Sequence, residues 1–253
     1  MAKRHTAHNM AMPISKPHRY ILQAQQDISA LDLAVKKLTL TMKEAVEDCY
    51  ANFTRDCSAE NIATLNVNSR KTFDICFGEW LLARKTSYEN STSSFVQIFL
   101  NQQQAHISTA QKAYLHSLNN TALLLYKVEE TAREHHIVIR LVQPDTRKIF
   151  RILYNPILPT LYAGEIVGLR LRTTSEGQSS GYGIYRFHPD IQDHLCTSVE
   201  QVCDVLTASG TAKNEEIMRE ISTLTEEFIF RTWCALTSSL NAKIHNSHEK
   251  HHS

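Results

Sequence analysis

The first half of the chain carries apolar residues at helical spacing. Between residues 24 and 120 they recur at intervals of three and four, with charged residues largely between them. This pattern is typical of amphipathic helices. The clearest run covers about seven turns, and its apolar face consists of Ile28, Leu31, Val35, Leu38, Met42, Ala45, Cys49 and Phe53.

The spacing of this long run fits two kinds of packing. The face can lie against other helices of the same domain, which is the interpretation we favour. It also fits a heptad seam, which predicts a homodimer formed by a coiled coil. The seam of that homodimer would consist of Ile28, Leu31, Val35, Leu38 and Met42.

Later helices are predicted from aromatic and capping residues. One helical face carries Phe73, Cys76, Phe77, Trp80 and Leu81, which indicates a core position for Trp80 rather than a ligand platform. Ser108 and Gln111 have the spacing of a capping box before a further helix. The polar stretch 87–94 is predicted to be a loop.

The hydrophobic period changes after residue 120. Short β-rich segments follow at 123–128, 137–142, 147–154, 166–172 and 183–187, separated by polar turns. The glycine-rich stretch 177–183 leads into a strand, so it predicts a hairpin loop rather than a phosphate cradle. Five such segments favour a small antiparallel barrel or a strongly curled sheet.

Two helices are predicted to close the chain. Pro189 suits the first turn of a helix whose apolar face is Ile191, Leu195, Val199, Val202 and Leu206. A longer helix over 213–243 is expected to direct Ile217, Ile221, Leu224, Phe228 and Leu236 inward.

The predicted fold class is α+β. It comprises a disordered basic arm (1–22), a helical region (23–120), a small β-domain (121–188), two C-terminal helices (189–244) and a disordered His-rich tail (245–253).

Composition places the chain among ordinary globular proteins. Its 253 residues are 42% hydrophobic, and 27 basic against 26 acidic residues leave a net charge of +1. That balance excludes a histone-like protein. No apolar run reaches signal-peptide or membrane-spanning length, so we expect a cytoplasmic protein with no membrane partner. The six sparse cysteines are interpreted as reduced thiols.

Several short motifs occur in an order that resembles a family of uncharacterised bacterial proteins. The motifs are Phe77-Gly-Glu-Trp80, the apolar helix 95–100, Leu125-Tyr-Lys-Val128, the segment 139–145 and the segment 164–170. The resemblance covers about residues 73–206 and implies a helical region with a small β-domain. Some members carry a SecA-type C-terminal zinc motif, whose Cys-x-Cys spacing is absent from this sequence. The resemblance implies no particular activity.

Familiar catalytic motifs are missing from the sequence. It contains no nucleophile elbow, P-loop or H-E-x-x-H helix. His194 and Cys196 would point apart on a helix, and adjacent His135 and His136 would face opposite sides of a strand. We therefore expect no cofactor, no metal and no catalytic residues, although an enzyme whose site forms only in the folded chain stays open.

The β-domain carries the charge bias of the chain. Residues 135–188 contain seven Arg or Lys residues and three Asp or Glu residues. Small barrels with exposed cations and aromatic rings often bind single-stranded nucleic acid. The candidate binding residues are Arg140, Lys148, Arg151, Arg170, Arg172, Tyr182, Tyr185 and Arg186. A solvated outer face of a barrel would also carry such arginines.

These patterns support a ranked set of functions. The leading prediction is a non-catalytic binding or adaptor protein, with single-stranded nucleic acid as the preferred ligand. The alternatives are a protein–protein scaffold that dimerises through the long helix and an enzyme whose site the sequence does not reveal.

Overall fold

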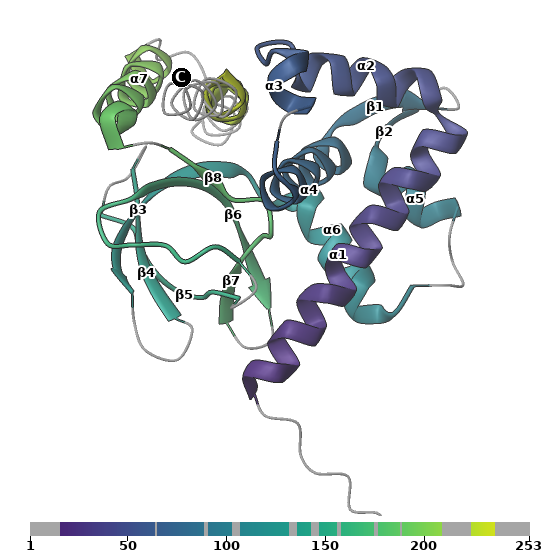
Figure 1. Cartoon of the computed structure of the whole chain (residues 1–253), viewed down its shortest axis with the longest axis horizontal. Coiled ribbons are helices and arrows are strands. Elements are labelled where there is room, and N and C mark those ends of the chain that lie inside the picture. The colour runs from purple at the N-terminus through teal and green to yellow at the C-terminus, as the bar shows by residue number, and fades with distance from the viewer. Residues whose placement is uncertain are drawn as a thin grey trace, which may run out of the picture.

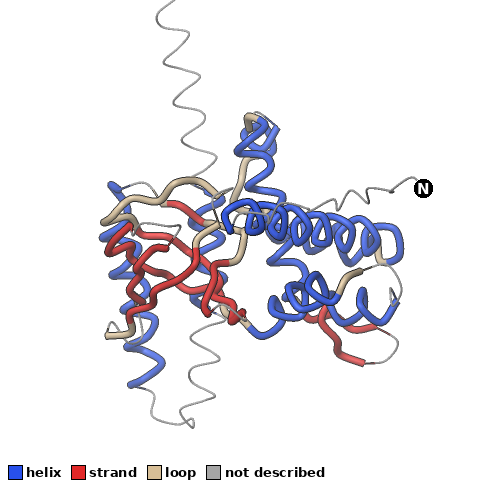
Figure 2. The backbone as a smooth tube through the Cα atoms, turned by 90° about the horizontal axis from the view of Figure 1, so that it is seen from below, coloured by secondary structure: helices blue, strands red, loops and turns tan. Residues whose placement is uncertain are grey.

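The chain folds into a helical region beside a small β-barrel (Figure 1). A computed structural model describes residues 16–63, 65–88, 91–102, 107–131, 136–142, 147–155, 158–174, 177–187, 189–208 and 224–235. Seen from below, the barrel strands gather on one side and the long first helix lies on the other (Figure 2). This is the α+β architecture that the change of hydrophobic period predicts.

The helical region contains six helices among the described residues. They are α1 (Lys16–Thr41), α2 (Lys43–Phe53), α3 (Ala59–Ala63), α4 (Val67–Ala83), α5 (Phe95–Gln102) and α6 (Thr109–Asn120). The predicted capping box of Ser108 and Gln111 is present at the start of α6.

Three boundaries differ from the predictions. Met42 leaves helical geometry, with φ −137° and ψ 45°, so the expected seven-turn helix is two helices. Residues 16–22 belong to α1 rather than to a disordered arm, and residues 1–15 lie outside the described residues. The predicted loop 87–94 forms part of a hairpin of β1 (Lys85–Tyr88) and β2 (Ser91–Ser94), where backbone pairing organises a polar sequence.

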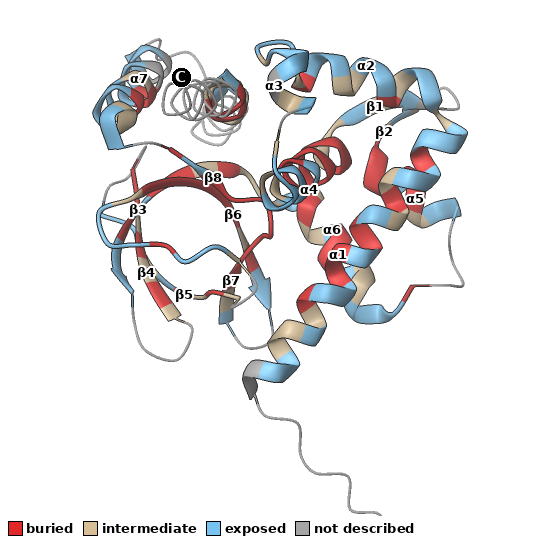
Figure 3. Cartoon of the chain, in the orientation of Figure 1, coloured by how far each residue is buried: buried red, intermediate tan, exposed pale blue. Residues whose placement is uncertain are grey.

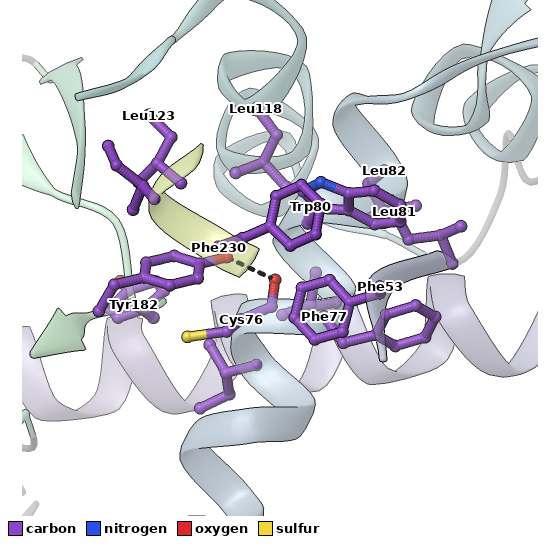
Figure 4. Packing of buried hydrophobic residues seen from close by; sticks show 14 of the residues in the cluster. Phe53, Cys76, Phe77, Trp80, Leu81, Leu82, Leu118, Leu123, Tyr182 and Phe230 are labelled. Carbon is purple, nitrogen blue, oxygen red and sulfur yellow. Dashed lines mark hydrogen bonds between the residues drawn. The ribbon is translucent and has the colours of Figure 1, made fainter. Parts of the chain in front are cut away.

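Aromatic side chains fill the core of the helical region (Figure 4). Phe53 lies 5.4 Å from Phe73 and 5.3 Å from Trp80, measured between ring centroids. Phe230, from the helical segment 224–235, stacks on Phe53 at 5.6 Å with an interplanar angle of 11°. The core position predicted for Trp80 is therefore confirmed.

The apolar face of α1 packs inside its own chain. Ile28, Leu31 and Leu38 are buried, and Val35 and Met42 pack against the same core. A second copy would have to displace α4 and α6, which contact α1 in the monomer. The predicted dimer seam is therefore wrong for this face, because the heptad-like spacing serves intramolecular packing.

Five strands close into a barrel of mixed direction. Around the ring they are β3 (Leu123–Thr131), β4 (His136–Leu141), β5 (Ile149–Leu153), β7 (Gly177–Ser180) and β6 (Ile166–Thr174), which pairs back to β3. The β5–β7 pair is parallel and the others are antiparallel, which corrects the all-antiparallel prediction. The ring strand β7 lies within the predicted loop 177–183. The predicted strand 183–187 contains only β8 (Tyr185–Arg186), which pairs with β6 on the same edge as β7.

Alternation along β6 divides two cores. Val167 and Leu169 point into the barrel, where they pack with buried residues of the other strands. Ile166 belongs to the core that the barrel shares with the helices, and Gly168, Arg170 and Arg172 alternate with the barrel-facing residues. One side of the barrel wall is therefore covered by helices.

Two C-terminal elements complete that cover. Helix α7 (Pro189–Ala208) begins at the predicted proline and buries Leu195, Val199 and Cys203. Of the predicted helix 213–243, residues 224–235 are described and helical, whereas Ile217, Ile221, Leu236 and the tail 245–253 lie outside the described residues. Leu224 is exposed rather than inward-facing.

All six cysteines are free thiols, as the sequence predicts. Within the described chain, no helix combines the length and the apolar character needed to cross a membrane.

Candidate functional site

The residues predicted to bind nucleic acid fall into two groups. Arg170 and Arg172 are only 2% and 7% exposed, and Tyr182 and Tyr185 are also buried. These four cannot contact a strand at the surface, which corrects their predicted role. The helices pack over the strand face that carries the two arginines (Figure 3).

Arg170 joins β6 to the helical segment 224–235. Its Nη1 donates to the carbonyl oxygen of Thr121, and its Nη2 pairs with the carboxylate of Glu226. Tyr185 donates its hydroxyl to the carbonyl oxygen of Cys76 at 3.2 Å. Both side chains therefore hold elements together.

Arg172 lies between two tyrosine rings. Its Cζ is 4.8 Å from the ring centroid of Tyr114 and 5.0 Å from that of Tyr182, which are cation–π distances. Its Nε donates to the carbonyl oxygen of Ser180 at 3.3 Å, and its Nη1 is 3.6 Å from Oδ2 of Asp27.

Asp27 is a buried carboxylate on the apolar face of α1. Its Oδ2 accepts a hydrogen bond from the hydroxyl of Tyr182 at 2.8 Å, and its Oδ1 accepts one from Gln23 at 2.8 Å. Burial raises the pKa of Asp27, although Arg172 and these hydrogen bonds act in the opposite direction.

Glu79 supports the same network from α4. Its Oε1 accepts hydrogen bonds from the hydroxyl of Tyr114 at 3.0 Å and from the backbone N–H of Tyr182 at 2.8 Å. A Cβ added at Gly183 would lie 2.9 Å from Oε2 of Glu79, and one at Gly181 would lie 3.0 Å from it. These two glycines let the β7–β8 connection approach the carboxylate.

A pocket of about 490 Å³ lies beside this network, between the helices and the barrel. Helix α1 contributes Gln23 and Asp27, and α6 contributes Tyr114. Arg172 and Tyr182 come from the barrel side. The pocket therefore brings together residues that are far apart in the sequence.

Sequence reasoning missed three members of this site, but signals for two were present. Asp27 lies three residues after Ala24 and four before Leu31, so its carboxylate falls on the buried face of α1. Glu79 lies inside the Phe77–Trp80 motif, beside core residues. Tyr114 lies on the helix predicted after Ser108, but the partner of its hydroxyl cannot be predicted from helical spacing.

A second feature is the outer face of β4 and β5. In the described chain no helix packs extensively on these two strands, unlike β6. Arg151 and Ile149 are exposed on β5, with Ile149 51% exposed. Lys148, just before β5, is also exposed. Residues 136–142 and 147–153 contain four Arg or Lys residues and no Asp or Glu.

The remaining predicted cations are partly neutralised. On β4, Arg140 donates from Nε to Oε1 of Glu129 at 2.7 Å. On β8, Arg186 pairs with Glu165 at 2.5 Å, at the start of β6 and away from the β4–β5 face. Strand alternation therefore puts Arg140 and Arg151 on the outer face of the pair. Lys148 lies just before β5, and Arg186 is on β8, away from both.

Among the described side chains, no group of three or more His, Cys, Asp and Glu residues is arranged to hold a metal ion. No family model matches the chain, and no curated protein or solved structure is significantly similar to it.

Proposed function

We propose that this protein binds single-stranded nucleic acid without catalysis, and that the β4–β5 face contacts the phosphate backbone. The carrying observation is the local charge, because residues 136–142 and 147–153 contain four cations and no acid, with Arg140 ion-paired to Glu129 of β3. Lys148 and Arg151 are exposed there. The whole chain has a net charge of only +1, so the bias is local.

The connectivity of the barrel also supports this proposal. Numbered along the barrel, its strands follow the ring order 1-2-3-5-4, with the third and fifth parallel. This is the Greek-key order of the OB-fold, which binds oligonucleotides on the face of its second and third strands. In this chain those strands are β4 and β5.

The face also offers surface for bases. Ile149 is exposed between the basic side chains, and it pairs across the strands with Arg140. His136 begins β4 opposite Leu153, at the other end of the same face. Nonspecific single-strand binding combines such a basic track with aromatic side chains on which bases stack. On this face the aromatic ring is that of His136, and Ile149 adds apolar contact.

Fluorescence anisotropy with labelled single-stranded RNA and DNA tests the proposal. We expect binding at low salt that weakens as salt rises, because bound cations displace condensed counterions. The Lys148→Glu/Arg151→Glu variant should lose most of this binding. The matched control is Lys36→Glu/Lys37→Glu, which makes the same charge change on the exposed side of α1.

Two results would reject the proposal. One is the absence of binding at low salt by the folded protein. The other is an equal loss of binding in both charge-reversal variants, because the chain would then respond to total charge rather than to the β4–β5 face.

We further propose a bacterial, cytoplasmic protein. The motif order between residues 73 and 206 supports the first part, and six free thiols support the second.

A further inference from the structure

We propose that the pocket between α1, α6 and the barrel binds a small organic anion, a phosphate or carboxylate compound, through Arg172. The pocket lining includes Leu153 at the end of β5 but neither Lys148 nor Arg151. The proposed site goes beyond nucleic-acid binding. Its volume of about 490 Å³ lies within the range of ordinary small-molecule sites.

Arg172 has N–H donors beyond those that its protein partners use. Its side chain is 8% exposed, its Nε donates to the carbonyl oxygen of Ser180, and its Nη1 is ion-paired with Oδ2 of Asp27 at 3.6 Å. A guanidinium carries five N–H donors, so an oxyanion in the pocket can accept from the donors that these two partners leave.

The guanidinium of Arg172 is also held in place. Tyr114 and Tyr182 lie within cation–π distance of Cζ, and these two residues line the pocket with Arg172. The hydroxyls of both tyrosines are in turn bonded to Glu79 and Asp27. A guanidinium fixed in this way needs little reorganisation to grip a planar carboxylate or a phosphate.

The charge of the pocket wall also favours an anion. Its lining contains Arg19 and Arg172 as cations and Asp27 as an acid. Both oxygens of Asp27 already accept hydrogen bonds from Tyr182 and Gln23, so they offer little to a cationic ligand. The pocket therefore offers a ligand the N–H donors of two guanidinium groups and few carboxylate acceptors, which favours an anion.

Polar groups at the edge can hold the rest of such a ligand. Ser117 and Thr173 line the pocket beside the short side chains of Ala110 and Ala113 on α6. Both alanines are exposed, so the pocket is open from that side. A ligand can enter without unfolding the network.

Calorimetric titration and thermal denaturation with inorganic phosphate, AMP and succinate test the site. At millimolar concentration, at least one of these probes should release measurable heat and raise the unfolding midpoint. Phosphate and AMP together indicate a phosphate site, whereas succinate indicates a carboxylate site.

Three variants locate the binding. Arg172→Lys keeps the positive charge but loses the planar pair of N–H donors that can bind an oxyanion bidentately. The substitution should weaken binding by about tenfold or more. Ala113→Phe fills the pocket from an exposed position, leaves the network intact and should abolish binding. Lys148→Glu/Arg151→Glu should bind the probes as the wild type does, which separates this site from the nucleic-acid face.

The inference is overturned if no probe binds the folded wild-type protein. It is equally overturned if Ala113→Phe binds a probe as tightly as the wild type, because the pocket would then not be the site.

Discussion

Arg170 and Arg172 are two residues apart on β6, so strand alternation directs both guanidinium groups to one side of the sheet. The sequence predicts this shared face correctly. It cannot show whether solvent or another element covers the face, because the covering residues Asp27, Glu79 and Glu226 are remote along the chain. The sequence does not distinguish a buried arginine from a solvated one. An acidic residue on the apolar face of a helix is the one local sign that a buried cation lies opposite it.

The Glu79 carboxylate provides a stability test at the scale of one residue. Glu79→Ala leaves two buried donors without an acceptor, the Tyr114 hydroxyl and the Tyr182 N–H. Each unpaired group costs about 1–3 kcal/mol. Glu79→Gln can place its amide oxygen where Oε1 lies and keep both bonds. Urea denaturation should show Glu79→Ala to be clearly less stable than Glu79→Gln, and equal stabilities would contradict this assignment.

Asp27 gives a prediction for pH. Because burial raises its pKa above the ordinary 3.8, the folded protein binds a proton that the unfolded chain has already released. The contribution of Asp27 to stability is therefore greatest at low pH. It falls as the pH rises from about 4 to the raised value and is constant above it.

Urea denaturation of the wild type and Asp27→Asn at a series of pH values measures this effect. The free energy of unfolding of the wild type, relative to the variant, should decrease with rising pH over that window. Asp48→Asn, which removes an exposed carboxylate on α2, controls for total charge. A relative stability that increases with pH would mean that attraction to Arg172 outweighs burial.

At the scale of elements, amphipathic spacing predicts helices better than it predicts their ends or the smallest strands. The capping box of α6 and the proline at the start of α7 can be predicted from the sequence, because each is a local signal. The strand β7 has the sequence Gly-Gln-Ser-Ser, without β-branched or aromatic residues. It is a strand because β6 and β5 supply pairing on both sides, which is a tertiary effect.

The docking of the helical segment 224–235 on β6 can be tested by a double-mutant cycle. A Cβ at Gly168 would lie 2.7 Å from Cγ2 of Ile229 and 3.1 Å from Cβ of Tyr185. Gly168→Ala should therefore destabilise the protein by about 1–3 kcal/mol through overpacking. Ile229→Ala removes the clashing methyl group, so the double variant should lose less stability than the sum of the two single losses.

Additive losses in chemical denaturation would show that the segment does not touch β6 at this point. The cycle needs no knowledge of function, and it tests the contact that buries Ile229.

For the whole molecule, the arrangement of helices decides which side of the barrel is available. Helix α7 and segment 224–235 lie over β3, β6 and β8, and helices α1, α4 and α6 lie beside β6 and β7, whereas β4 and β5 are on the other side of the barrel (Figure 1). The sequence predicts a basic barrel but not this division. Lys148 and Arg151 are exposed and Arg140 is partly exposed, as predicted for binding residues. Arg170 and Arg172 are buried instead.

The salt dependence of nucleic-acid binding distinguishes contact with local cations from attraction by the net charge of the whole molecule. With 27 basic and 26 acidic residues, the molecule has almost no net charge, so long-range attraction to a polyanion is weak. If the four cations of residues 136–142 and 147–153 each contact one phosphate of a single strand, with Arg140 exchanging Glu129 for phosphate, the slope of log K against log salt is about −3, since each contact contributes about −0.7.

The Lys148→Glu/Arg151→Glu variant removes two such contacts, so its slope should fall to about −1.4. The control Lys36→Glu/Lys37→Glu changes the net charge by the same amount and should keep the wild-type slope. Anisotropy titrations at several salt concentrations measure all three slopes. If the two variants had the same slope, binding would follow the total charge of the chain, and the division of the barrel into covered and uncovered sides would have no bearing on nucleic acid.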